Sequence, residues 1–297
     1  MLATVARCVA TSASTEGGQS LTLSRRFAVC GALCFALPPT LRPGDAVAVD
    51  TTRLERYSTS IRGPGDAGLS AWGEAWSNSC SWYSTPETPS SSAAAALPKW
   101  LQGKWQVTSS LDDVSFPIGR KFAWNDIPGK RMVSILPLPN IGNTPSFEVE
   151  YASAIEAQRG ANAKSTLEAF WPAAKVVDIS APASGMLRLR YSSPTRSKAN
   201  VEQSVSVALC ASEGGLLGED QYMLSEVFQQ DNLEQGTRGE YQILTQFTRD
   251  AGGNGVRAKQ RVAAFLQPTD GQYFDAQGKP VALYDYSYRY TRLADAP

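Results

Sequence analysis

From Trp100 onward, apolar and polar residues alternate in short runs that Pro, Gly, Asn and Asp separate. The run that contains Val205, Val207 and Leu209 is typical, because every second residue is apolar. Successive side chains of a β-strand point to opposite faces, so this period of two predicts strands with one buried face. The predicted strands cover residues 104–110, 120–124, 131–136, 146–152, 175–180, 186–192, 201–210, 221–229, 239–248, 255–266 and 281–292.

One interval interrupts the alternation. Residues 152–170 are rich in Ala, Glu, Gln and Lys, and they predict a short helix inserted between two strands. The Gly-rich segments DAGGNG and PTDGQYFDAQGKP separate the last three strands and predict an antiparallel meander. About ten such strands remove their exposed edges by closing on themselves. We therefore predict a mainly β fold, an antiparallel up-and-down barrel over residues 97–297 with a short helical insertion.

The beginning of the chain has a different pattern. An apolar run at residues 28–37 follows Arg25-Arg26 and ends at Pro38-Pro39. Crossing a bilayer as a helix takes about 20 apolar residues, whereas the apolar core of a secretory signal needs about 7 to 15. The run is therefore predicted to be a signal segment. A buried core helix is the competing interpretation, and the two prolines argue against it.

Small residues follow this run. Ala46-Val47-Ala48 has the small-x-small pattern that a signal peptidase recognises, so we predict cleavage after Ala48. The first 23 residues are rich in Ser and Thr and contain one acidic residue and no lysine, a composition typical of an organelle transit peptide. Residues 1–48 thus resemble the bipartite leader of thylakoid lumen proteins, with Arg25-Arg26 marking the twin-arginine route. The resemblance implies the chloroplast thylakoid lumen as the location; a bacterial type of export signal is the alternative.

Charge limits the partners of the chain that remains after cleavage. The whole chain has 28 basic and 28 acidic residues, and loss of the leader leaves 24 and 26, a net charge of about −2. This balance gives no basic field for nucleic acid. No second apolar run approaches the about 18 residues of a membrane span, so no transmembrane segment is expected in the mature chain.

Cysteine and histidine content limits the chemistry. The chain has no histidine and five cysteines. Three of the cysteines lie in the leader, so Cys80 and Cys210 are the two that remain after cleavage. In an oxidising compartment Cys80 and Cys210 would form a disulfide, and two separate thiols are the alternative. Without histidine, a Ser-His-Asp or Cys-His mechanism lacks its general base, and a zinc site lacks a common ligand. We therefore expect no catalytic residues, no metal and no cofactor.

Residues 49–96 contain many Pro and Gly residues and the tract SSSAAAA, which predict a flexible arm. Within this arm, Trp72, Trp76 and Trp82 lie close together in sequence. Either these indoles fold back over the surface of the domain, or they form an exposed anchor for a partner, because Trp is enriched at interface hot spots.

The two ends of the strand-rich region predict a contact. Gly103 and Trp105 lie where the alternation begins, and Arg289 and Arg292 lie on the last strand. The first and last strands of a closed barrel are neighbours, so a guanidinium can cover the indole ring. This pattern resembles the G-x-W motif and the basic residue that seal one barrel end in lipocalins and the wider calycin group. We expect Gly103, Trp105 and Arg289 to form this contact; Arg292, which shares the parity of the tyrosines on that strand, is the alternative.

The last predicted strand has a tyrosine at every second position, namely Tyr284, Tyr286, Tyr288 and Tyr290. Strand geometry places all four on one face. Either they pack against a neighbouring strand or the inserted helix, or they form a wall that contacts a flat apolar ligand or a protein partner.

A second resemblance concerns function. The segments PKWLQGKWQV and YRYTRLADA are similar to those of a group of uncharacterised thylakoid-lumenal and cyanobacterial β-rich proteins, some algal members of which are linked to photosystem biogenesis. It covers about residues 97–297 and implies a non-enzymatic lumenal protein that associates with a photosystem complex, with photosystem II as the expected one, during assembly or maintenance. The alternative is a lipocalin-like carrier of a pigment, quinone or lipid, with an apolar cavity of roughly 300 to 1,000 Å³. An enzyme acting on such a ligand is the third hypothesis.

Overall fold

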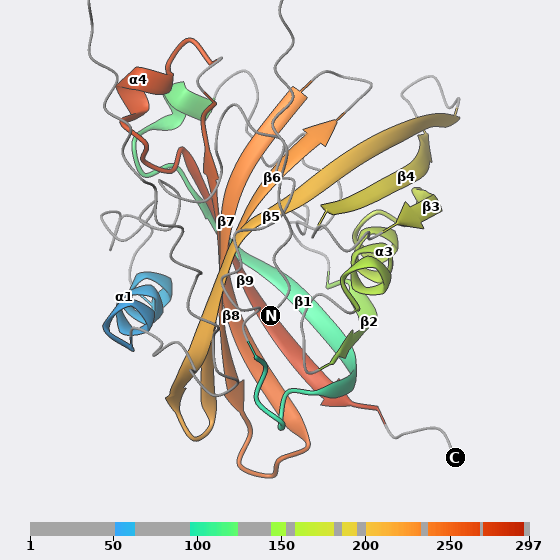
Figure 1. Ribbon diagram of the computed structural model, residues 1–297, viewed down its shortest axis with the longest axis vertical. Helices are drawn as coiled ribbons and strands as arrows, with labels where there is room; N and C mark the ends of the chain where they lie inside the picture. The colour runs from blue at the N-terminus through green and yellow to red at the C-terminus, as the bar shows by residue number, and fades with distance from the viewer. Residues whose placement is uncertain are drawn as a thin grey trace, which may run out of the picture. The chain divides into compact units, whose positions relative to one another are not determined.

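The computed structural model describes residues 51–62, 96–123, 144–152, 158–180, 186–194, 200–232, 237–267 and 270–293. These residues form one antiparallel sheet of nine strands, in the order β2-β1-β9-β8-β7-β6-β5-β4-β3, with short helices beside it (Figure 1). The strands are β1 (Gly103–Ser115), β2 (Ser146–Tyr151), β3 (Lys175–Ser180), β4 (Met186–Pro194), β5 (Asn200–Gly218), β6 (Gln221–Asn232), β7 (Thr237–Arg249), β8 (Gly255–Phe265) and β9 (Ala282–Arg292). The helices are α1 (Thr51–Arg62), the 3-10 helix η2 (Arg120–Ala123), α3 (Arg159–Phe170) and α4 (Tyr273–Ala276).

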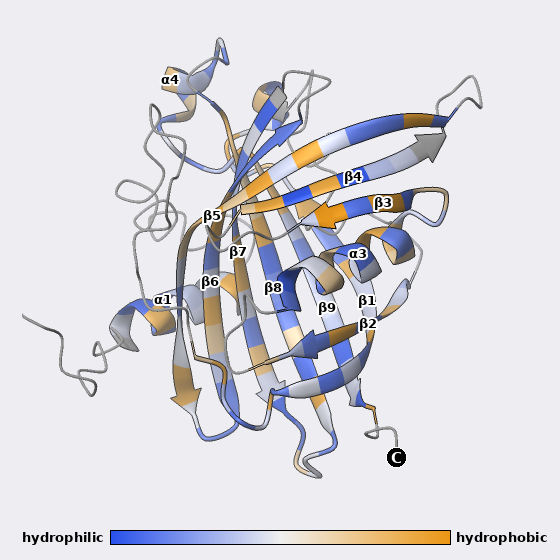
Figure 2. Cartoon of the chain, turned by 45° about the vertical axis from the view of Figure 1, so that its right-hand side comes forward, coloured by the Kyte–Doolittle hydropathy of each residue, from blue (hydrophilic) through white to orange (hydrophobic). Residues whose placement is uncertain are grey.

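The alternating pattern predicted every strand of this sheet. Figure 2 shows the alternation as bands of opposite hydropathy along β6 to β9. The meander predicted for the last three strands is confirmed, and each strand from β3 to β8 pairs antiparallel with the next one along the chain. The strand predicted at 120–124 was wrong for its described residues, 120–123, which form η2 after a turn that contains Gly119 with φ of 101°. The strand predicted at 131–136 lies outside the described residues.

The sheet does not close, which corrects the predicted barrel. Strands β1 and β9 are neighbours, as predicted for the first and last strands of a barrel. However, β2 continues the sheet beyond β1, while β3 lies at the opposite edge, and no ladder joins β2 to β3 in the described part of the chain. The predicted helical insertion is confirmed as α3, and it connects these two edge strands along the chain.

Helix α3 lies between the two edge strands in space as well (Figure 1, Figure 2). The Asn162 side chain bonds both backbone groups of Glu150 in β2: its Nδ2 donates to the carbonyl and its Oδ1 accepts from the N–H, each at 2.9 Å. On the other side, the Glu168 carboxylate accepts from the backbone N–H of Val176 in β3 at 3.2 Å. Polar side chains of the helix thus satisfy backbone groups that a neighbouring strand would otherwise pair.

The inner face of the sheet, defined as the face that carries Trp105, buries the main core. Residues of all nine strands contribute to this core, those of β3 being half-buried. Helix α3 adds Ala163, Leu167 and Phe170, which are spaced by three or four positions and therefore share one side of the helix. Because strands far apart in the sheet order meet in one core, the sheet curls around it.

Helix α1 packs on the opposite, outer face. Leu54 and Tyr57, each 1 % exposed, join a second apolar cluster with residues of β6 to β9. The Tyr57 hydroxyl also donates to Glu213 Oε1 of β5 at 2.6 Å. The beginning of the segment that we predicted as a flexible arm is therefore a packed helix. This helix was not predicted, because Pro, Gly and the tract SSSAAAA punctuate the rest of that segment.

Arg261 of β8 connects α1 to the sheet. Its guanidinium is 2 % exposed and donates to both carboxylate oxygens of Asp285 in β9, at 2.5 and 2.6 Å. The same group donates to the backbone carbonyl of Ser60 at 2.5 Å. Ser60 lies in the last turn of α1, where carbonyls have no partner within the helix and where a cation is favoured. A single buried side chain therefore satisfies groups on both elements.

The substitution Arg261→Met should lower the free energy of unfolding by about 3 kcal/mol, because it leaves a half-buried carboxylate and a helix carbonyl without their cation. The control is Arg257→Met on the same strand. Its ion pair with Asp250 is exposed, so this change should cost less than about 1 kcal/mol. Urea unfolding of both variants measures the difference; equal losses would contradict the role given to Arg261.

Candidate functional site

The predicted contact between the first and last strands exists, but its cation is Arg292. Arg292 lies opposite Trp105 in the β1–β9 register, and its Cζ is 4.3 Å from the centroid of the indole. The prediction of Arg289 was wrong, because Arg289 lies opposite Thr108 and is exposed on the outer face. Side chains alternate between the two faces of a strand, so Arg292, an even number of positions from the tyrosines of β9, lies on the inner face with them, and Arg289 does not.

Arg292 also holds the turn that precedes β1. Its Nη1 donates to the Gln102 carbonyl at 2.9 Å, and its Nη2 donates to the Trp100 carbonyl at 2.7 Å. Gly103 follows this turn with φ of 119°, and a Cβ at this position would lie 2.6 Å from Arg292 Nη1. Glycine is therefore required by the backbone conformation, and a side chain at this position would also displace the guanidinium from its contacts.

The four tyrosines of β9 belong to the core. Tyr284, Tyr286, Tyr288 and Tyr290 are between 1 % and 6 % exposed. This burial agrees with packing against neighbouring strands, the first of the two interpretations, while a contact with a ligand or partner stays a prediction. Burial raises the pKa of Tyr286, Tyr288 and Tyr290, so these hydroxyls stay protonated at neutral pH.

A small cavity of about 140 Å³ lies on the inner face between α3 and the tyrosines. Tyr288 and Tyr290 line one side of it. The ion pair of Arg159 in α3 and Glu226 in β6, with 3.3 Å between Nη2 and Oε1, lines another. Ligand pockets usually start at roughly 300 Å³. The space at this position is therefore too small for a pigment, a quinone or a lipid.

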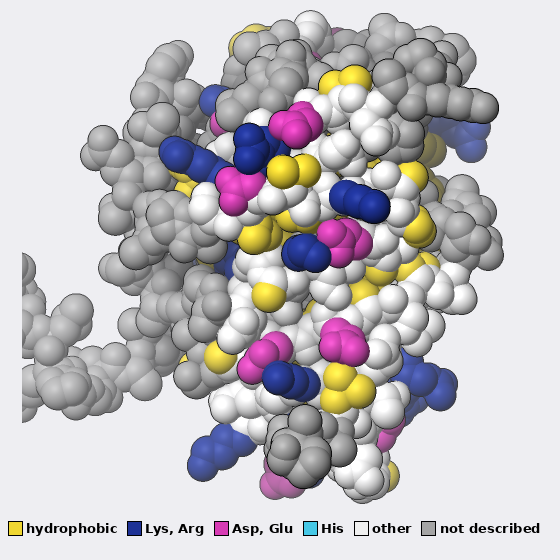
Figure 3. All heavy atoms as spheres, turned by 90° about the vertical axis from the view of Figure 1, so that its right-hand side faces the viewer, with side chains coloured by type: hydrophobic (Ala, Val, Ile, Leu, Met, Phe, Trp, Pro, Cys, Tyr) yellow, Lys and Arg dark blue, Asp and Glu magenta, His cyan; other side chains and the backbone are white. Residues whose placement is uncertain are grey.

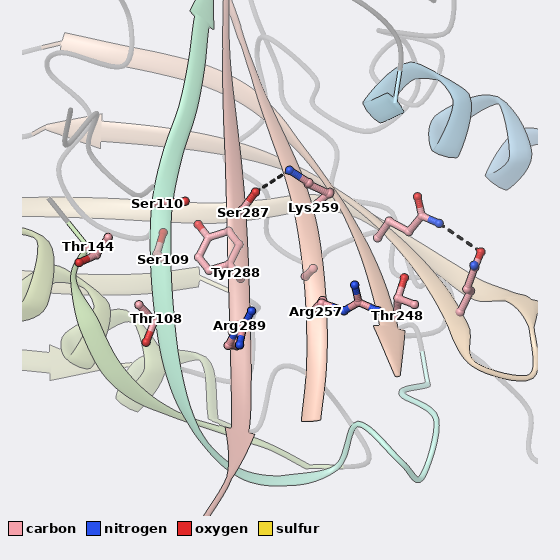
Figure 4. A pocket seen from close by; sticks show the side chains of 13 residues that line it. Thr108, Ser109, Ser110, Thr144, Thr248, Arg257, Lys259, Ser287, Tyr288 and Arg289 are labelled. Carbon is pink, nitrogen blue, oxygen red and sulfur yellow. Dashed lines mark hydrogen bonds between the residues drawn. The ribbon is translucent and has the colours of Figure 1, made fainter. Parts of the chain in front are cut away.

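A larger groove, about 580 Å³, lies on the outer face. The side chains that line it come mainly from two adjacent rows that cross the sheet from β1 to β6, and each row follows the strand register (Figure 4). The first row consists of Thr108, Arg289, Arg257, Thr248 and Gln221. The second consists of Ser110, Ser287, Lys259 and Gln246. The sequence did not indicate this groove, because polar residues at alternate strand positions are the ordinary pattern of an exposed face.

Two of the cations that line the groove, Lys259 and Arg257, each have a carboxylate as a hydrogen-bond partner. Lys259 Nζ donates to Asp112 Oδ2 at 2.9 Å and to Ser287 Oγ at 2.6 Å. Burial opposes ionisation of Asp112, but the hydrogen bonds from Ser287 and Lys259 outweigh it and lower the pKa of this carboxyl. Arg257 Nε donates to Asp250 Oδ1 at 2.8 Å.

Arg289 is the exception. Its side chain is exposed, and within the described part of the chain no carboxylate bonds to it. It lies directly opposite Arg257 in the β8–β9 register. Cβ atoms at such positions are about 5 Å apart, so the two arginines begin side by side, but among the described residues only Arg257 of the two reaches a carboxylate. The groove is therefore more positive than its own carboxylates can compensate.

Residues 90–294 match the family model DUF6816, a domain of unknown function. The chain belongs to the DUF6816 family. Comparisons with curated proteins and with solved structures find no match. The matched range contains all nine strands of the described sheet, helix α3 and every residue of the two groove rows, whereas α1 precedes it.

Two predicted features of the arm concern residues outside the described part of the chain. Trp72, Trp76 and Trp82 all lie there. Cys210, on β5 of the DUF6816 domain, is 2 % exposed and takes part in a disulfide. Its predicted partner Cys80 lies outside the described residues, so the pairing of these two cysteines stays a prediction.

Other surfaces of the DUF6816 domain differ from the groove. On the side formed by α3 and β2 to β4, basic and acidic side chains are interspersed (Figure 3).

Within the described ranges, no three His, Cys, Asp or Glu residues are grouped so that they could hold a metal ion. Over the same ranges, every helix is too short or too polar to cross a membrane.

Glu240 of β7 is a buried acid on the outer face. It is 2 % exposed, and burial raises its pKa to about 7, although a hydrogen bond with Gln267 and the charge of Arg238 oppose the rise. Its register partner in β8 is Phe265, an apolar residue. The carboxyl is therefore partly protonated at neutral pH.

The variants Arg292→Ala and Arg289→Ala test the corrected contact. Loss of Arg292 should lower the free energy of unfolding by about 1 to 2 kcal/mol, because it removes a cation–π contact and two hydrogen bonds to backbone carbonyls. Loss of Arg289 should change it by less than about 0.5 kcal/mol, since the side chain is exposed. Urea unfolding gives both values, and the reverse order would restore the original prediction of Arg289.

Glu240 makes stability depend on pH. Because its pKa is higher in the folded chain than the usual value of 4.5, the folded state binds the proton more tightly. Its contribution is complete below about pH 4.5 and is lost as pH rises to about 7. The variant Glu240→Gln should therefore be about 1 to 3 kcal/mol more stable than the parent at about pH 8, and nearly equal to it at about pH 4.5. Unfolding curves across this range test this, and a difference that does not change with pH would contradict it.

Proposed function

We propose that the mature chain is a non-enzymatic binding protein of the chloroplast thylakoid lumen that associates with a photosystem complex, photosystem II in the first instance, during assembly or maintenance. Two sequence features support the location and the partner: the bipartite leader at residues 1–48 and the likeness of residues 97–297 to lumenal proteins linked to photosystem biogenesis. The structural support is the groove on the outer face, whose lining residues carry hydroxyl, amide and cationic groups.

The division between the two faces favours recognition over carriage. Large aromatic side chains occupy the inner face, and the cavity between α3 and the tyrosines measures about 140 Å³. The lipocalin-like carrier of a pigment, quinone or lipid needs roughly 300 Å³ or more, so this alternative has less support. The outer groove, at about 580 Å³, is lined by side chains that carry hydroxyl, amide and cationic groups on aliphatic stems, so it can bond a partner through both kinds of surface.

We also infer that the fold is related in architecture to lipocalins and the wider calycin group. The support is the combination of Gly103, Trp105 and Arg292 where the first and last long strands meet, the same combination by which those proteins seal one barrel end. The departure from them is the opening between β2 and β3, in which α3 lies.

The proposed association is tested with the tagged chain expressed in the chloroplast of a photosynthetic cell. The processed chain should co-migrate with photosystem subunits on a native gel and should capture them from solubilised thylakoids. The control is the double variant Arg25→Lys, Arg26→Lys, which alters the twin arginines and leaves the mature chain unchanged. It should fail to reach the lumen and should lose the co-migration. A processed chain found only as a free pool in lumen extracts would contradict the proposal.

A further inference from the structure

We propose that the outer-face groove is a binding site for an oxyanion of the phosphate or phosphodiester class, carried on a small molecule that bears hydroxyl groups. This groove is also the structural support for the association proposed above, but the small ligand proposed here does not depend on that partner. The inference rests on three properties of the groove, which are its uncompensated charge, the position of Arg289 and the polar groups around it.

The charge of the groove calls for one further anion. Three cations line it, Arg257, Lys259 and Arg289. The carboxylates of Asp250 and Asp112 bond Arg257 and Lys259, respectively. Among the described residues, Arg289 has no such partner, so the cluster retains one positive charge. A singly charged anion such as a phosphodiester would neutralise it.

Within the described part of the chain, Arg289 is the cation that is free to receive an oxyanion. Arg257 and Arg289 lie opposite each other in the β8–β9 register, but the Arg257 guanidinium extends toward Thr248 and its Nε donates to Asp250 (Figure 4). The Arg289 guanidinium presents several N–H donors in one plane, which match pairs of phosphate oxygens. An anion bound there would receive charge-assisted hydrogen bonds from Arg289, and the cations of the neighbouring strand would add to the attraction.

The surroundings favour an organic ligand over a bare ion. Thr108 and Thr248 lie at either side of the arginine pair in the first row, while Ser110 and Ser287 in the second row already donate to Asp112 and can only accept from a ligand. Hydroxyls of this kind bond the hydroxyl groups of a polyol. The groove volume of about 580 Å³ lies within the usual range for organic ligands. Because the lining side chains stand on paired strands, the site is largely formed before a ligand binds.

Two probes test the site and distinguish a soluble ligand from a lipid headgroup. The first is glycerol 3-phosphate, titrated calorimetrically into the purified chain, with glycerol as the uncharged control. The second is sedimentation with phosphatidylcholine vesicles, with and without phosphatidylglycerol. Each is applied to the parent chain, to Arg289→Gln and to Arg188→Gln. Arg188 is a matched control because it is an exposed arginine of β4 that lies outside the groove.

Arg289→Gln should weaken binding about tenfold or more, and Arg188→Gln should not. Glycerol 3-phosphate binding with this pattern supports the site with a soluble phosphorylated ligand. Binding of only the phosphatidylglycerol vesicles, with the same pattern, supports the site with a lipid headgroup. The proposal is overturned if neither probe binds the parent chain, or if the two variants weaken binding equally. Since the probes are simple molecules and the protein is purified, failure at this point would leave the photosystem proposal to its own test.

Discussion

The cover that α3 gives to the two edge strands is the interaction on which the rest of the structure depends. A curled sheet whose edges do not meet exposes backbone groups that would otherwise recruit another chain. In this fold Asn162 and Ser165 bond the backbone of β2, and Glu168 bonds the backbone of β3. The apolar side of the same helix completes the core through Leu167 and Phe170. One short helix thus satisfies two edges and fills the space between them.

This arrangement separates the roles of the two faces. The inner face is occupied by aromatic side chains, including the four tyrosines of β9. Among the residues that line the cavity beside α3, the charged ones are Arg159 and Glu226. The outer face carries α1 near one end of the groove. Gln246 belongs to both, because it lines the groove and its Oε1 accepts from Ser58 of α1 at 3.2 Å. Helix docking and ligand recognition therefore share one surface.

The proposed recognition role follows from that separation. A sheet of paired strands holds the side chains of both groove rows in a fixed register, and the core behind it resists deformation. Buried Arg261 holds α1 on the same surface. An exposed cation opposite another cation is unfavourable in isolation, and such local conflicts in a well-packed domain are expected at sites where a ligand supplies the missing charge.

The sequence alone determined the strands, their faces and the meander, because a period of two and glycine-rich turns are local properties of the chain. It also indicated that the first and last strands meet and that Trp105 is covered by an arginine of β9, although it did not decide correctly between Arg289 and Arg292. Only the tertiary structure decided how the sheet ends, since contacts between α3 and two distant edges leave no periodic signal. It also decided the groove, because Thr108, Arg289 and Arg257 become neighbours only through strand register, which the order of residues along the chain does not contain.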